Sequence, residues 1–137
     1  MASAQSGIFA AGTSSHCFLE FASRPETAAL ELVQALADLE EPHTTVGGAN
    51  LVLGVRPTIW TQVAPDKLPV HASDFYEPIR GVGGFTMPAT QQDAWVWVSG
   101  AAPDLVFDVC VDIVGRWRRW RRWRPRSPAG PTGTAAT

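Results

Sequence analysis

The sequence predicts an α+β domain in which helices cover one face of an antiparallel sheet. Short apolar runs with strand character alternate with segments that repeat apolar residues every three or four positions. The order along the chain is strand, helix, strand, short helix with a long loop, strand and helix, which fits this fold class. Of the 137 residues, 45% are hydrophobic and 18% are charged, values that are typical of one modest globular domain.

The first strand follows a small and polar N-terminal segment. Residues 1–15 are interpreted as a flexible lead, and residues 16–21 form a short apolar run with two aromatics that indicates a strand. Pro25 ends this strand. A helix over residues 27–39 is predicted because one side of it would collect the apolar side chains of Leu30, Val33, Leu36 and Ala37.

A second strand is expected at residues 50–55, after a Gly-Gly turn, and it is apolar enough to be central. Pro57 then begins a short helix that ends near Val63, since proline is well suited to the first helical turn. Residues 65–88 contain several Pro and Gly-Gly breaks and little periodicity. They indicate a long loop, a feature that compact domains carry mainly when it is functional or supported by another part of the protein.

The clearest strand is residues 93–100, where Trp95 and Trp97 share one face and small or branched residues share the other. Residues 103–114 predict a helix with one apolar stripe. A split βαβ arrangement of this kind needs one more strand after residue 115, and the sequence shows none there. We therefore expect an incomplete sheet, in a domain that spans residues 16–115.

The charge of the chain changes abruptly after Gly115. The formal net charge is −2, but residues 1–115 carry four basic and all thirteen acidic residues, and the other seven arginines fall within residues 116–126. Residues 127–137 are rich in Pro, Gly and Thr. The whole segment 116–137 is expected to be disordered, because its like charges repel.

Three explanations of this basic tail stay open. Trp117, Trp120 and Trp123 recur at every third position, so the tail has the residues to insert at a membrane interface. Arginines interleaved with tryptophans also suit binding to a nucleic-acid backbone with base stacking. The favoured explanation is a shift in the reading frame of a GC-rich gene, which produces chains rich in Arg, Trp, Pro, Gly and Ala.

Cysteine and targeting signals predict a cytoplasmic protein. Cys17 and Cys110 each lie in an apolar run and form no zinc-binding pattern, so both are interpreted as buried free thiols. The first fifteen residues lack the basic start and long apolar stretch of a signal peptide. No apolar run reaches the roughly 18 residues of a membrane span.

Three segments together resemble a known family. Residues 48–60 read GANLVLGVRPTIW, an apolar strand followed by a glycine and a short helix with a tryptophan. Residues 87–99 read MPATQQDAWVWVS, a PATQ.D entry to a strand that ends in serine. Residues 7–9 lead into the strand at 16–21. These features, spread over roughly residues 5–115, resemble the N-terminal domain of DyP-type (dye-decolourising) haem peroxidases.

The resemblance implies a ferredoxin-like domain, haem b, hydrogen peroxide and an organic electron donor. It also implies a distal Asp in a GxxDG motif, a distal Arg and a proximal His that binds iron, all in the second half of the family's chain. No GxxDG and no His follow Asp93 here, and each Arg after residue 100 belongs to the tail. No catalytic, cofactor-binding or metal-binding residue is therefore assigned.

The remaining candidates have ordinary structural explanations. His16, His43 and His71 are interpreted as structural or exposed residues, and Trp95 and Trp97 as core or domain-contact residues before electron relays. The chain is thus expected to be a truncated N-terminal half of a peroxidase that is inactive alone. The alternatives are a non-catalytic binding or structural module that pairs through an open sheet edge, with homo-oligomers possible, and membrane or nucleic-acid binding through the tail.

Overall fold

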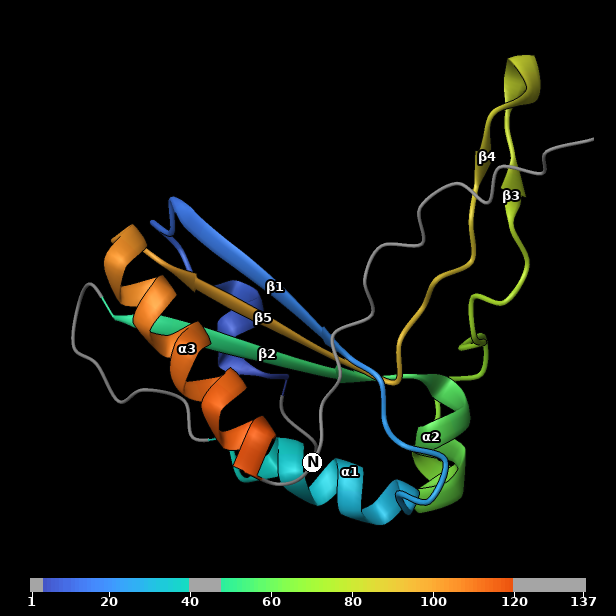
Figure 1. Ribbon diagram of the computed structural model, residues 1–137, viewed down its shortest axis with the longest axis horizontal. Coiled ribbons are helices and arrows are strands. Elements are labelled where there is room, and N and C mark those ends of the chain that lie inside the picture. Colours follow the sequence, from blue (N-terminus) through green and yellow to red (C-terminus); the bar gives the residue numbers. More distant parts are fainter. Residues whose placement is uncertain (1–3, 40–47, 120–137) are drawn as a thin grey trace, which may run out of the picture.

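The protein is a three-stranded antiparallel sheet with helices packed on one face (Figure 1). The computed structural model describes residues 4–39 and 48–119. Its long strands are β1 (Ser15–Phe21), β2 (Ala49–Val55) and β5 (Ala94–Gly100), in the sheet order β1-β5-β2. Both outer strands run antiparallel to β5, so the α+β prediction is confirmed.

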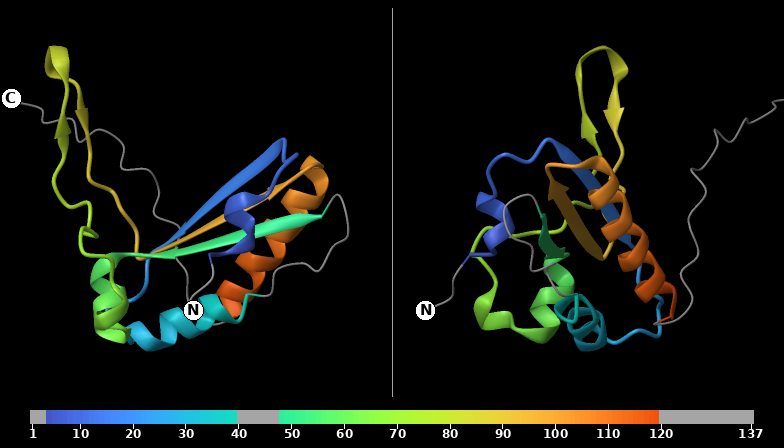
Figure 2. Two further views of the ribbon diagram at one scale, coloured as in Figure 1. Left: turned by 180° about the vertical axis from the view of Figure 1, so that it is seen from behind. Right: turned by 90° about the vertical axis from the view of Figure 1, so that its left-hand side faces the viewer.

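The helices lie close to the positions that the sequence predicts. They are α1 (Ala29–Ala37), α2 (Pro57–Val63) and α3 (Pro103–Arg119). The two views of Figure 2 place α1 and α3 on the same side of the sheet, with α2 beyond one end of β2. This is the split βαβ topology of a ferredoxin-like domain. In the part of the chain that the structure describes, no fourth strand lies beside β1.

The core lies between the sheet and the helices because each strand alternates its side chains. In β5, Ala94, Val96 and Val98 face the helices and are almost completely buried. Leu32 and Leu36 of α1 cover them from the helical side. At about 25 cal/mol per Å² of buried apolar surface, such a continuous cluster is the main source of stability.

α3 continues beyond the point where the sequence analysis ended the domain. Val106, Cys110, Ile113 and Trp117 recur at helical spacing and are all buried. The ring of Trp117 lies 4.3 Å, centroid to centroid, from that of Phe21. The expectation that disorder begins at residue 116 is therefore wrong for residues 116–119, because Trp117 completes the apolar stripe. Residues 120–137 lie outside the described residues.

The N-terminal segment differs from the flexible lead that the sequence predicts. Residues 6–9 form a short 3-10 helix beside β2. The carboxamide of Gln5 donates to the carbonyl of Leu53 and accepts from its N–H, each at 2.8 Å. Gly7 is buried so closely that an added Cβ would lie 2.4 Å from the carbonyl oxygen of Leu51. The segment therefore packs on the sheet through a fit that only glycine allows.

The long loop predicted at residues 65–88 contains a small hairpin. Its strands are β3 (Ile79–Arg80) and β4 (Thr86–Met87), which pair antiparallel. Gly83 and Gly84 have φ values of +71° and +82°, a left-handed conformation that favours glycine in tight turns. The hairpin projects away from the sheet (Figure 1), and its side chains are exposed.

Candidate functional site

The face of the sheet that carries no long helix displays a group of aromatic rings. Phe18 of β1 stacks on both Trp95 and Trp97 of β5, with ring centroids 5.9 Å and 6.0 Å apart. The indole N–H of Trp97 donates to Nδ1 of His16 at 3.2 Å. Phe18 remains 60% exposed. We call His16, Phe18, Trp95 and Trp97 the aromatic face.

The aromatic face follows from the strand register. Phe18 is paired with Trp97, and His16 with Ser99, in the ladder between β1 and β5. Since residues directly opposite each other share a face of the sheet, the two strands bring their aromatics together. The sequence predicts that Trp95 and Trp97 share a face, but the contribution of Phe18 and His16 depends on how β1 pairs.

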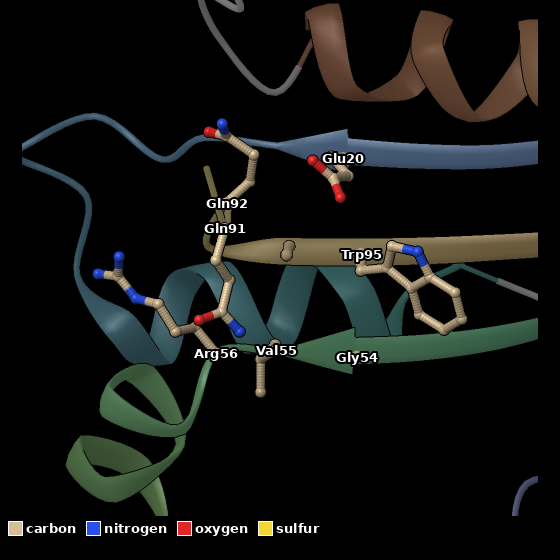
Figure 3. A pocket seen from close by; sticks show the side chains of 8 residues that line it. Glu20, Gly54, Val55, Arg56, Gln91, Gln92 and Trp95 are labelled. Atoms are coloured by element: carbon tan, nitrogen blue, oxygen red, sulfur yellow. The ribbon is translucent and has the colours of Figure 1, made fainter. Parts of the chain in front are cut away.

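A pocket of about 180 Å³ lies at one end of this face. Figure 3 shows Glu20 on β1 and Trp95 on β5, with Arg56 just past the end of β2. The full set of lining residues is Glu20, Gly54, Val55, Arg56, Gln91, Gln92, Ala94 and Trp95. The lining is mixed in character, with two amides, one acid, one base and one indole. Gln91 is also tied to the backbone, since its Oε1 accepts from the N–H of Phe75 at 2.6 Å.

Arg56 is held by two carboxylates next to this pocket. Its guanidinium lies 3.1 Å from Asp93 Oδ1 and 3.3 Å from Asp74 Oδ2. The contact of Nε with Asp74 is ionic rather than a directed hydrogen bond. Both carboxylates are largely buried. Because they lie against the guanidinium, they neutralise the charge of Arg56. Arg56 is therefore poorly suited to capture an anionic ligand in the pocket.

Asp93 connects the ends of all three long strands through an ion pair and hydrogen bonds. Asp93 Oδ2 accepts from the backbone N–H and the hydroxyl of Ser23, each at 2.7 Å. The N–H of Arg56 donates to the carbonyl of Asp93 at 3.0 Å. Ser23 follows β1, Arg56 follows β2 and Asp93 precedes β5. The PATQ.D segment thus supplies an aspartate whose evident role is to bind the strand ends together.

The pocket lined by Glu20, Arg56 and Trp95 does not fit a haem group. A pocket of about 180 Å³ is smaller than the roughly 300–1,000 Å³ of typical cofactor and ligand sites, and no histidine lines it. His16 is engaged with Trp97 on the open face, and His71 is exposed in the loop. Across residues 4–39 and 48–119, no cluster of three His, Cys, Asp or Glu side chains could hold a metal ion. His43 lies outside the described residues.

The two cysteines, distant in sequence, are neighbours in the structure. Cys17 of β1 and Cys110 of α3 are both free thiols. Burial, together with a hydrogen bond and electrostatic interaction with Cys17, raises the pKa of Cys110 to about 12. Cys110 is therefore a protonated, unreactive thiol at neutral pH. The sequence indicates that both lie in apolar surroundings but not that they meet.

No helix among the described residues has the length and apolar character needed to cross a membrane. The exposed surface of α3 carries charges as well as apolar side chains, for example Arg116, which donates to Asp112 at 2.8 Å one turn earlier in the helix.

Comparisons with known proteins support the fold. No protein-family model matches the sequence, and no curated protein matches it either. Among solved structures, a variant of DypB from Rhodococcus jostii RHA1 in complex with heme aligns with a TM-score of 0.65 and 22% identity. That alignment covers 82% of this chain and 37% of that chain.

Two further DypB structures align with TM-scores of 0.59 and 23% identity, covering 74% of this chain and 34% of theirs. One is a variant in complex with manganese, and the other is DyPB from Rhodococcus jostii RHA1 in a second crystal form. The chain thus spans little more than a third of the length of the proteins it matches. It shares with DyP-type peroxidases the fold of that part of the molecule.

Proposed function

We propose that the chain is the ferredoxin-like domain of a DyP-type peroxidase lineage that supports a haem-bearing partner domain and performs no peroxide chemistry alone. The observation that carries the proposal is the structural match, which extends over 82% of this chain but only 37% of DypB. Haem b, hydrogen peroxide and an organic electron donor belong to the whole peroxidase in this proposal. The free thiols of Cys17 and Cys110 suit a reducing, cytoplasmic setting.

The aromatic face supports this role as a scaffold. An exposed Phe18 stacked on two half-buried tryptophans makes an apolar surface of the kind that marks a contact between domains. The remaining two thirds of a DypB-like chain would supply a domain to cover it. In this arrangement Trp95 and Trp97 contribute contact area rather than electron transfer.

A membrane or nucleic-acid role for the tail receives less support. Arg116 is paired with Asp112, and the indole of Trp117 is buried against Phe21. The first turn of the basic segment therefore belongs to the folded domain, and these two side chains are already engaged within it. The same burial weighs against a frame shift at residue 116, because an unrelated reading frame has no reason to complete the stripe of α3.

Haem titration of the full 137-residue chain tests the proposal. Haem is added to the chain and to three variants, His16→Ala, His43→Ala and His71→Ala, and the Soret band is recorded. We expect spectra of free or non-specifically associated haem, equal in all four proteins and without saturation at one equivalent. A saturable one-to-one Soret shift that a single His→Ala substitution removes would overturn the proposal, because it would reveal an axial ligand.

A further inference from the structure

The two edges of the sheet are treated differently. The outer edge of β2 is covered by the 3-10 helix of residues 6–9, and Gln5 satisfies both backbone groups of Leu53 there. On the opposite side, β1 pairs only with β5 within the described residues. Alternate residues of β1 therefore direct their N–H and C=O groups away from the sheet. Such an edge is a template for a further strand.

The centre of the α3 flank next to this edge is apolar and exposed, with Asp104 and Arg118 at its two ends. Phe107 is 66% exposed and Val111 is 54% exposed, and their spacing of four places them on the same side of the helix. Arg116 and Trp117 line a hollow together with α1, so that side of α3 faces α1. At 100° per residue, Phe107 and Val111 lie on the opposite flank from Arg116. They therefore border the open edge of β1 rather than α1.

We propose that the chain forms a twofold-symmetric dimer in which β1 pairs antiparallel with β1 of a second copy, centred on Phe18. This pairing joins the two sheets into one sheet of six strands. It places Phe18 opposite its own copy, and it places Glu20 of each chain opposite His16 of the other. It rests on the open edge of β1, whereas the proposed function rests on the structural match and the aromatic face, with which the dimer shares Phe18 and His16.

The strand register makes this pairing self-complementary. On the open face, a row Val52–Trp97–Phe18 continues into the same row of the second copy in reverse order. On the helical face, Cys17 meets Leu19 of the other copy. Glu20, the acidic residue of β1, thus lies opposite the imidazole of His16 from the other copy, and all other pairs apart from the strand ends are apolar. Aromatic cross-strand pairs are favourable, and a carboxylate can accept a hydrogen bond from the ring N–H that a neutral imidazole keeps.

The helical layer allows the same symmetry. α3 packs over both β1 and β5, and neighbouring strands are about 4.8 Å apart. The twofold axis runs midway between the two β1 strands, so a helix above the line between β1 and β5 lies roughly 5 Å from it. The axes of the two α3 helices are then about 10 Å apart, which is the upper end of the distance at which helices pack. Val111 lies near the level of Phe18, because Cys110 of the same helix meets Cys17 and Trp117 meets Phe21. Val111 then contacts its counterpart, which adds an apolar contact in the helical layer to the strand pairing.

Sedimentation velocity of the full chain, between about 1 and about 300 µM to span weak and moderate dimer affinities, tests the proposal. The mass should rise from 14.8 kDa toward twice that value. Glu20→Lys and His16→Glu should each weaken dimerisation at least about tenfold, because they place like or uncompensated charges opposite each other. The double variant reverses the pair and should restore the dissociation constant to within about threefold. Glu77→Lys, the same charge change in the exposed loop, is the matched control and should have no effect.

Val111→Lys reports on the helical layer separately and should weaken dimerisation without lowering the melting temperature, since its side chain is exposed in the monomer. A monomer over the whole concentration range would overturn the proposal. So would a dimer that neither Glu20→Lys nor Val111→Lys weakens, or a double variant that stays as weak as the single ones. Haem titration does not enter these readouts, so failure here leaves the proposed function to its own test.

Discussion

Replacing Trp117 with alanine tests whether α3 and its last turn belong to the folded domain. A large aromatic side chain buries about 150–250 Å², which at about 25 cal/mol per Å² corresponds to roughly 4–6 kcal/mol as an upper limit. Trp117 is only 7% exposed and loses its ring contact with Phe21 in the variant. Because it lies in the last described turn, where the helix can relax into the space, we expect a loss of about 3 kcal/mol in the free energy of unfolding.

Urea denaturation followed by far-UV circular dichroism, at a concentration where the chain is monomeric, measures this loss. Trp97→Ala is the matched control, and it should cost less because that ring lies half-exposed on the open face. Gly115→Ala is a companion variant: an added Cβ there meets nothing within 4 Å, so it should stabilise a continuous helix by about 0.5–1 kcal/mol. A loss below about 1 kcal/mol for Trp117→Ala, together with no gain for Gly115→Ala, would refute the helix beyond residue 114.

Three further predictions follow from the packing. Gly7→Ala should lower the free energy of unfolding by about 1–3 kcal/mol, because the added Cβ would press on the carbonyl of Leu51. An unchanged urea midpoint would mean that residues 6–9 do not pack on β2. Asp93→Ala should cost about 2 kcal/mol, because it removes charge-assisted hydrogen bonds and leaves Arg56 with one partner, and Asp93→Asn should cost less in the same assay. The pKa of Cys110 is about 12 in the folded chain and near 9.0 for an unfolded thiol, so the free energy of unfolding should fall as pH rises between these values. Cys110→Ala should flatten that part of the pH profile.

The strands and helices were predictable because their patterns are local. The alternation of Trp95 and Trp97 with small residues defines the face of β5, and the stripe from Val106 to Ile113 defines α3. Their antiparallel arrangement follows from the order of elements. The ends of these elements depend on contacts that a local pattern does not contain.

The misplaced end of α3 illustrates that limit. Arginines dominate the composition after Gly115, so a single tryptophan that continues the stripe at the right spacing carries little weight in the sequence, although it decides the structure by packing on Phe21. Gln5 is similar, because its role at the edge of β2 depends on a residue 48 positions away. A side chain that hydrogen-bonds to a strand edge, as a neighbouring strand would, leaves no recognisable pattern in the sequence.

The site residues show the same division. The PATQ.D segment is visible in the sequence, but the joining of Asp93 with Ser23 and Arg56 exists only after β1, β2 and β5 have come together. Likewise Cys17 and Cys110 meet only because α3 crosses over β1. That the chain carries no catalytic, haem-binding or metal-binding residue stays a prediction.

The central claim is that this chain supports a peroxidase without performing its chemistry, and peroxide turnover tests that claim most directly. The full 137-residue chain is incubated with one equivalent of haem, and the oxidation of a dye by hydrogen peroxide is compared with that of free haem at the same concentration. The account predicts equal rates, unaffected by His16→Ala, His43→Ala or His71→Ala. Peroxide-dependent oxidation well above the rate of free haem, lost on replacement of one of these histidines, would contradict it.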